Sequence, residues 1–427
     1  MIDLESFQIP LSAKQALIVS DSEWGLEELE GLLTTMGGTA QERLKLPENH
    51  RINPGTYLGK GKVEEVKRIL EARNLDMLLV DFDLSPSQLK NLEKALKKLI
   101  LDRSGIILEI FNRHARTKEA KLQVEMARLQ YLMPRLTHLW SHFERQRGSG
   151  GGALKGKGMG EKQIEVDRRL VKERINTIAR KLKEVEGARQ LHRRHRDALL
   201  KVAIVGYTNA GKSTLLNALT RSDVLVENAL FATLDATVRC LNPKSRPIVL
   251  GIDTVGFIDR LPHGLVASFR STLGEILEAD LLLHVLDASH PEVRRHFDVT
   301  MGVLEELGAK NIPMMIVFNK MDLCENPSLV KVWGASLMRE FSTVTPLYIS
   351  AQSPAQVDEA RKSIMAFFER GMETYEVVIP FEDGKTVAQI HELGNVEAKR
   401  TTDKGIFFRV RTMKEFANQL NLGRYKI

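Results

Sequence analysis

Short apolar runs alternate, along most of this chain, with stretches whose apolar residues recur every three or four positions. In the first third, runs of strand length are separated by amphipathic stretches of helix length. Such alternation predicts a small α/β domain with a largely parallel sheet. The expected strands cover residues 15–20 and 77–80, the expected helices cover 26–36, 63–72 and 85–96, and a further apolar run covers 106–108.

A longer helical periodicity follows on both sides of a glycine-rich stretch. Apolar residues recur in steps of three and four over several turns, within about residues 117–147 and again within 164–185. These stripes predict two amphipathic helices that pack against each other as a coiled-coil-like hairpin. Residues such as Leu122, Leu129 and Ile178 are expected to form the seam between the helices rather than a ligand site.

From residue 198 onward, apolar runs of strand length again alternate with helical stretches. The runs predict a second α/β domain with a mostly parallel sheet, followed by a third, small α/β domain. The expected strands of the second domain cover 201–205, 248–253, 313–318 and 346–349, and those of the third cover 375–380 and 405–410 around a helix at 387–393.

The composition is that of a globular chain, with 43% hydrophobic and 27% charged residues. The first residues are acidic and lack a signal-peptide pattern, and the most apolar stretches are too short to span a bilayer. We therefore expect a cytoplasmic protein with at most peripheral membrane association. Cys240 and Cys324 are far apart and lack ligand spacing, which favours unpaired thiols in a reducing compartment.

The net charge of +7 is unevenly distributed. Residues 112–201 contain 23 Lys and Arg against 10 Asp and Glu, so this segment carries +13 and the remainder carries −6. The asymmetry suggests that one part of the molecule contacts a polyanionic partner. On charge alone, the alternative of a solvated helical face stays equally open.

Residues 148–160 connect the two helices of the expected hairpin and consist mostly of glycine. A helical hairpin turns with far fewer residues, so this connection is either a simple linker or a thin basic tip. A tip without bulky side chains can enter a groove in folded RNA, where lysines meet phosphates. We favour the tip, with Lys155, Lys157 and Lys162 as RNA-contact candidates.

The sequence G-Y-T-N-A-G-K-S at 206–213 fits the phosphate-binding P-loop, G-x-x-x-x-G-K-[ST]. An expected strand precedes it and a helix start follows it, which is the context that the motif requires. Lys212 can reach the terminal phosphates, and the Ser213 hydroxyl can hold Mg²⁺. The expected nucleotide contacts in this motif are Gly206, Tyr207, Thr208, Asn209, Ala210, Gly211, Lys212 and Ser213.

Motifs at the ends of two expected strands farther along the chain indicate which base the site binds. The sequence N-K-M-D at 319–322 fits N-K-x-D, the guanine-reading loop of GTPases. The Asp322 carboxylate can accept two N–H bonds from guanine, and adenine lacks that pattern. Asn319 and Lys320 brace this loop, and a backbone N–H within 350–352 can meet guanine O6. The contacts expected here are Asn319, Lys320, Met321, Asp322, Ser350, Ala351 and Gln352.

Two segments between the P-loop and the N-K-M-D motif are expected to respond to the γ-phosphate. Asp253 suits an outer-shell role toward Mg²⁺, and the Gly256 amide suits the γ-phosphate. Thr233 and Thr237 compete for the second hydroxyl on Mg²⁺, and spacing alone does not decide between them. The further expected nucleotide contacts are Phe231, Ala232, Thr233, Leu234, Asp235, Asp253, Thr254, Val255 and Gly256.

Phe257 occupies the position at which a Ras-type GTPase has the glutamine that orients the attacking water. A phenylalanine side chain cannot orient water. No residue is therefore assigned with certainty as catalytic, and we expect slow intrinsic hydrolysis that a partner accelerates.

The assembled motifs resemble one family, the HflX GTPases, which bind and split ribosomes. The resemblance covers about residues 15–355 and includes motifs outside the nucleotide domain. Among these are Y-L-G-K-G-K at 57–62, L-S-P-S-Q at 84–88, and D-R-S-G-I-I-L at 102–108. At 157–165 the chain departs from the family pattern G-x-R-G-P-G-E-T-Q-L-E, with Lys for Arg, Met for Pro and Lys for Thr.

The resemblance implies that the N-terminal domain and the hairpin engage the large ribosomal subunit, with the glycine loop directed toward the peptidyl-transferase centre. It also implies that Thr233 joins Ser213 as a Mg²⁺ ligand and that the ribosome stimulates hydrolysis of GTP to GDP. We expect a monomer with no DNA partner. The alternative is an RNA-binding assembly factor in which GTP only sets the conformation.

The expected division of the chain has four parts. An N-terminal α/β domain covers 1–112, and a basic helical hairpin covers 113–197. The GTPase domain covers 198–370, and a small C-terminal α/β domain with no assigned role covers 371–427.

Overall fold

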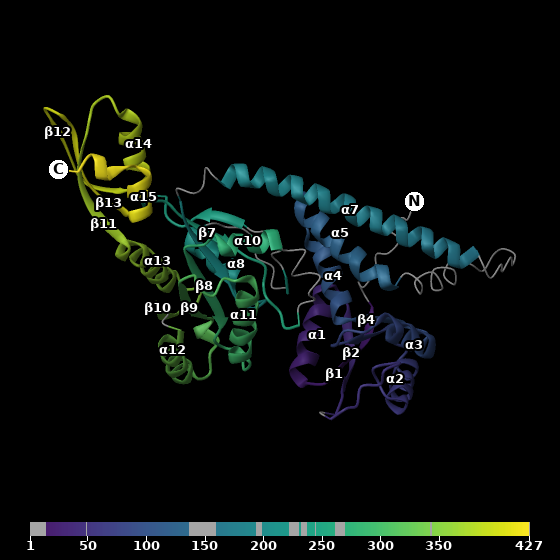
Figure 1. Ribbon diagram of the computed structural model, residues 1–427. Helices are drawn as coiled ribbons and strands as arrows, with labels where there is room; N and C mark the ends of the chain where they lie inside the picture. The colour runs from purple at the N-terminus through teal and green to yellow at the C-terminus, as the bar shows by residue number, and fades with distance from the viewer. Residues whose placement is uncertain are drawn as a thin grey trace. The chain divides into compact units, whose positions relative to one another are not determined.

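The computed structural model describes residues 14–47, 49–135, 159–193, 199–221, 230–231, 237–243, 245–260, 270–341 and 344–426. Within these ranges it contains three β-sheets (Figure 1). Contacts divide the chain into two compact units. The first unit comprises Met1–Glu186, Ala229–Leu234 and Arg260–Arg270, and the second comprises Gly187–Asn228, Asp235–Asp259 and Ser271–Ile427. The finer division at 112, 197 and 370 stays a prediction.

The first unit begins with a four-stranded parallel sheet in the order β2-β1-β3-β4. The α/β class predicted for this region is confirmed. Its strands are β1 (Gln15–Ser20), β2 (Thr39–Lys45), β3 (Met77–Val80) and β4 (Leu99–Asp102). Its helices are α1 (Glu23–Thr35), α2 (Lys60–Ala72), α3 (Pro86–Leu96) and α4 (Arg103–His114).

Three elements of this region differ from the sequence prediction, and one of them is strand β4, which was not expected. Strand β2 was not expected, and its residues alternate between exposed and half-buried, as befits an edge strand. The apolar run at 106–108 lies within helix α4, whose residues from Arg103 to Phe111 are all buried. A helix that is buried on every side has no apolar periodicity that would distinguish it from a strand.

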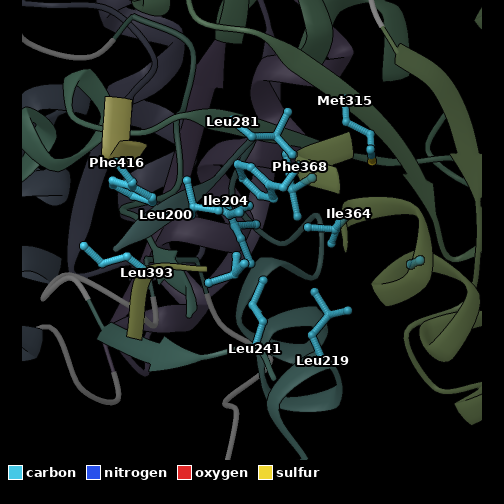
Figure 2. Close-up of a cluster of buried hydrophobic side chains, with 14 of the residues drawn as sticks. Leu200, Ile204, Leu219, Leu241, Leu281, Met315, Ile364, Phe368, Leu393 and Phe416 are labelled. Carbon is cyan, nitrogen blue, oxygen red and sulfur yellow. The ribbon is translucent and has the colours of Figure 1, made fainter. Parts of the chain in front are cut away.

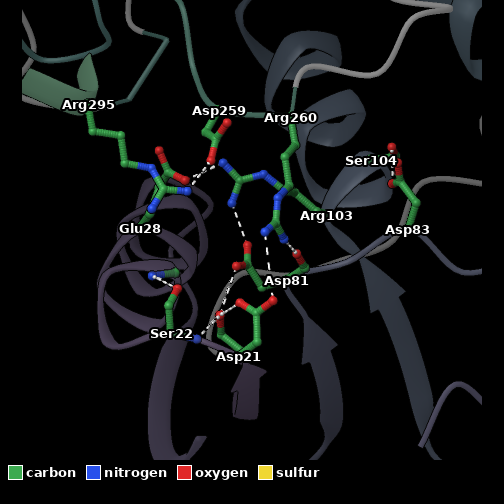
Figure 3. A network of polar contacts seen from close by, with 12 residues as sticks. Asp21, Ser22, Glu28, Asp81, Asp83, Arg103, Ser104, Asp259, Arg260 and Arg295 are labelled. Atoms are coloured by element: carbon green, nitrogen blue, oxygen red, sulfur yellow. Dashed lines mark hydrogen bonds and ion pairs between the residues drawn. The ribbon is translucent and has the colours of Figure 1, made fainter. Parts of the chain in front are cut away.

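A buried arginine joins α1, β3 and α4 at the carboxyl edge of this sheet (Figure 3). The guanidinium of Arg103 forms ion pairs with the carboxylates of Asp81 and Glu28, and both carboxylate side chains are at most 6% exposed. The Ser20 hydroxyl donates to Asp81 at 2.8 Å. Because buried charges are tolerated only when they are paired, this network fixes the register between the helices and the sheet.

Helix α5 (Lys118–Leu132) continues into a short 3₁₀ turn (Met133–Arg135), and α7 covers Met159–Arg193. The predicted seam between two amphipathic helices is confirmed, because Leu129, Val171 and Ile178 form one buried cluster. Arg174 of α7 also donates to both carboxylate oxygens of Glu125, at 2.7 and 3.0 Å. The described part of the hairpin is therefore held by apolar packing and by a two-pronged ion pair.

The second unit contains a six-stranded sheet in the order β10-β9-β8-β5-β7-β6. All neighbouring strands are parallel except β6, which is antiparallel to β7. Its strands are β5 (Leu200–Val205), β6 (Thr237–Cys240), β7 (Val249–Asp253), β8 (Leu281–Asp287), β9 (Met314–Asn319) and β10 (Val344–Tyr348). Its helices are α8 (Lys212–Thr220), α10 (Arg270–Leu277), α11 (Val293–Leu307), α12 (Pro327–Phe341) and α13 (Pro354–Arg370).

A three-stranded antiparallel sheet in the order β11-β13-β12 ends the chain. Its elements are β11 (Met372–Ile379), α14 (Gly384–Leu393), β12 (Asn395–Thr402), β13 (Gly405–Met413) and α15 (Lys414–Gln419). Leu393 and Phe416 belong to the same buried cluster as Leu200 and Leu281 of the six-stranded sheet (Figure 2). The two sheets of the second unit therefore share one continuous core.

Two expectations from composition can be compared with the described residues. None of the described helices is both long enough and apolar enough to cross a membrane. The thiols of Cys240 and Cys324 are both free, as predicted.

Candidate functional site

The P-loop connects the fully buried strand β5 to helix α8. Gly206 has φ +146°, and a Cβ there would lie 2.2 Å from the Val285 carbonyl oxygen. Gly211 has φ +89°, and a Cβ there would lie 2.3 Å from Asn319 Nδ2. Both positions need glycine for its backbone freedom and for its lack of a side chain. At these two positions no side chain therefore covers the backbone amides of the turn.

Lys212 begins α8 and is only 6% exposed. Its Nζ donates to the Tyr207 carbonyl oxygen at 2.7 Å. Burial lowers the pKa of the Lys212 ammonium to about 8, and the nearby Asp253 opposes that shift. An ammonium held in a buried turn at a helix N-terminus is well suited to compensate a phosphate group.

Ser213 and Asp253 lie together at the start of α8 and the end of β7. The Ser213 hydroxyl donates to Asp253 Oδ2 at 2.6 Å. A hydroxyl and a carboxylate are oxygen donors of the kind that Mg²⁺ prefers beside phosphates. The pair therefore fits a Mg²⁺ ion with Ser213 as ligand and Asp253 in the outer shell.

The guanine-loop residues line a pocket of about 400 Å³. Met321 and Asp322 come from the loop after β9, and Ser350 and Gln352 come from the loop after β10. The sequence analysis named these four but missed two further lining residues, Ser353 and Gln356. Those two lie at the N-cap and in the first turn of α13, and no motif marks them.

Asn319 ties this pocket to the P-loop. Its Nδ2 donates to the Ala210 carbonyl at 2.9 Å, and its Oδ1 accepts from the Ala351 amide at 2.9 Å. Asn319 is 2% exposed. Lys320 adds an ion pair with Asp287 at 2.7 Å. The loops after β9 and β10 and the P-loop are therefore joined by one buried hydrogen-bond network.

The amides of the loop after β10 are hydrogen-bonded in this structure. Ser350 N donates to Gln356 Oε1 at 2.6 Å, and Gln352 N donates to Ser350 Oγ at 3.3 Å. Ala351 N is bonded to Asn319, as described above. A guanine O6 that enters the pocket has to replace or share one of these acceptors.

Residues 253–257 pass directly beside the P-loop. The Thr254 hydroxyl donates to the Ile204 carbonyl at 2.7 Å. A Cβ on Gly256 would lie 3.0 Å from Lys212 Nζ and 2.9 Å from Thr208 Cγ2, so a larger residue would crowd both side chains. Phe257 is 1% exposed. The backbone of residues 253–257 therefore borders the P-loop, and position 257 contributes no polar side chain there.

Several predicted contact residues are not among those just described. Ala232, Thr233, Leu234 and Asp235 lie outside the described residues, as do Lys155 and Lys157. Lys162 lies in α7, in a part whose side chains are not described. Phe231 belongs to the first unit, where its ring packs edge-on against Phe111 with the centroids 4.6 Å apart.

Three family models match consecutive parts of the chain. A model described as "GTP-binding GTPase N-terminal" matches residues 23–112. One described as "GTP-binding GTPase Middle Region" matches 114–196, and one described as "50S ribosome-binding GTPase" matches 201–320. Together the three matches cover most of the chain between residues 23 and 320.

Full-length relatives agree with these models. The chain is 42% identical to "GTPase HflX" of Magnetococcus marinus over 409 residues, which cover 94% of this chain and 92% of that protein. It is 39% identical to "GTPase HflX" of Akkermansia muciniphila over 428 residues, which cover 96% of this chain and 97% of that protein. With the P-loop and the N-K-M-D loop joined through Asn319, these relationships show that the chain belongs to the HflX family of GTPases, which hydrolyse GTP.

Proposed function

We propose that this GTPase binds the large ribosomal subunit, requires Mg²⁺ through Ser213 and Thr233, and splits or rescues ribosomes, with hydrolysis stimulated by the ribosome. The observation that carries the proposal is the buried Phe257, whose backbone is hydrogen-bonded to the P-loop. Phe257 cannot position an attacking water, so a partner has to complete the site. The model described as "50S ribosome-binding GTPase" supports the ribosome as that partner.

Helix α7 supports a polyanionic partner. Its described part exposes basic side chains along more than two turns. Exposed lysines and arginines on one helix are suited to phosphate contacts, and such contacts weaken steeply as salt rises. The exposed basic residues include Arg168, Arg169, Lys172, Arg180, Lys181 and Lys183.

Addition of purified large ribosomal subunits is expected to raise the GTP hydrolysis rate. Partner completion of incomplete GTPase sites accelerates hydrolysis by about 10³–10⁵-fold, so an increase of at least tenfold is a conservative expectation. The measurement is phosphate release at fixed enzyme concentration while the subunit concentration is varied. Small subunits at the same concentrations serve as the matched control. A rate that stays flat across large-subunit concentrations would contradict the proposal.

A second candidate is a ribosome-assembly factor in which GTP only sets the conformation. The apolar side chain at position 257 favours it, because such a protein needs no residue that orients water. The two candidates predict different responses of the hydrolysis rate to large ribosomal subunits. Large subunits should leave the hydrolysis rate unchanged for an assembly factor, while the choice between GDP and GTP still alters binding.

A further inference from the structure

The segment that follows Asp253 is bonded to the P-loop through its main chain. Phe257 N donates to the Gly206 carbonyl at 3.1 Å, and the Phe257 carbonyl accepts from Thr208 N at 2.7 Å. The Phe257 ring is buried. The backbone of this segment, rather than the side chain of Phe257, therefore borders the phosphate-binding turn.

Asp259 is held from two directions just beyond this contact. Its amide donates to the Tyr207 hydroxyl at 2.8 Å. Its Oδ2 accepts from Arg295 Nη2 at 2.7 Å (Figure 3). The Asp259 side chain is 18% exposed and that of Arg295 is 39% exposed, so the carboxylate is partly buried while the guanidinium also meets solvent. One bond comes from the P-loop and the other comes from helix α11.

Tyr207 is itself fixed by the same helix. Its ring stacks on the His296 ring, with the centroids 3.9 Å apart and the planes 8° apart. Burial lowers the pKa of His296 to about 3, with His290 as the next cause, so the imidazole is neutral at physiological pH. Arg295 and His296 are consecutive residues of α11, so one helical turn supports both contacts to Asp259.

The backbone just before Asp259 borders the Lys212 ammonium. Gly256 lies three residues before Asp259 and approaches Lys212 so closely that a Cβ there would be 3.0 Å from Nζ. A displacement of the 256–259 backbone changes the distance between the Gly256 amide and the Lys212 ammonium. Misplacement by about 1 Å at a reacting centre can lower a rate about 10²-fold.

We propose that Tyr207 and Arg295, with His296 as the support of Tyr207, are positioning residues for GTP hydrolysis. They hold Asp259 and thereby fix the Gly256 backbone against the P-loop. We expect their effect to fall on the chemical step, because the predicted guanine contacts lie in other loops, after β9 and β10. The inference concerns hydrolysis by the protein alone and does not depend on the ribosomal partner.

The test compares single-turnover hydrolysis with GDP affinity in the full-length protein, without ribosomes. Arg295→Ala is expected to lower the hydrolysis rate about tenfold or more, while the Kd for GDP stays within about twofold. Arg295→Lys keeps a cationic donor and should restore part of the rate. Tyr207→Phe removes only the hydroxyl, so its rate should fall while the ring can still stack on His296.

Arg294→Ala is the matched control, because Arg294 precedes Arg295 on the same helix but lies over the Trp333 ring, 5.5 Å from its centroid. Its rate should stay close to that of the wild type. The inference would be overturned by an undiminished rate in both Arg295→Ala and Tyr207→Phe, or by equal losses of rate and GDP affinity. If Arg295→Ala fails to fold, Tyr207→Phe alone decides, since it deletes a single oxygen.

Discussion

Replacement of Lys212 by alanine is expected to lower kcat/KM for GTP hydrolysis by at least about a hundredfold, because loss of one preorganised donor costs about 10²–10³ in rate. Lys212 is the buried cation of the P-loop, with its Nζ fixed on the Tyr207 carbonyl. Its removal leaves the phosphates without this buried charge. Steady-state hydrolysis and GTP titration measure the loss.

The lowered pKa of Lys212 adds a pH dependence. Because burial lowers the pKa of Lys212 to about 8, the ammonium is charged below pH 8 and becomes neutral as the pH rises above it. Phosphate binding requires the charged form, so GTP affinity of the wild type should fall above pH 8. Lys212→Ala should show neither the affinity nor this dependence. Near-normal hydrolysis by a folded Lys212→Ala protein would refute the assigned role.

Replacement of Arg103 by methionine is expected to destabilise the first unit by about 3–5 kcal/mol. Arg103 is 2% exposed and pairs with the carboxylates of Asp81 and Glu28. Without Arg103, the buried carboxylates of Asp81 and Glu28 lose the cation with which both of them pair. Burial already raises the pKa of Asp81, and the Arg103 charge is the largest influence that opposes the shift. Urea unfolding and amide hydrogen exchange in β3 measure the change.

Arg43→Met provides the matched control for Arg103→Met. Arg43 pairs with Glu30 on the surface of the same unit, with side-chain exposures of 45% and 32%. Surface pairs contribute about 0–1 kcal/mol, so this variant should unfold almost as the wild type does. Equal effects of the two replacements would mean that the buried network does not stabilise the fold.

Much of the fold could be predicted because most central strands are continuous apolar runs in a parallel sheet. The sequence analysis did not assign strands β2, β4, β6, β8 and β12, and all of these except β8 lie at sheet edges. In β12 most residues are exposed, and in β2 exposed and half-buried residues alternate. Such strands are stabilised by pairing with a neighbour rather than by their own apolar content, so the sequence pattern alone does not reveal them.

The nucleotide site could be located from short motifs because each motif is continuous in sequence and lies at a strand end. The residues that support these motifs from neighbouring helices could not be located in this way. Gln356 enters the guanine pocket from α13, and His296 supports Tyr207 from α11. Neither belongs to a motif, and each is brought to the site only by the packing of its helix. Tertiary structure therefore determines these contacts.

The proposed coupling of the nucleotide state to ribosome binding is tested most directly by sedimentation with purified large subunits. The protein should sediment with the subunits in the presence of a non-hydrolysable GTP analogue and remain largely in the supernatant with GDP. The bound fraction should fall between low and moderate salt, because basic contacts to phosphate release counterions. Equal sedimentation with GDP and with the analogue, or none with either, would contradict the proposal.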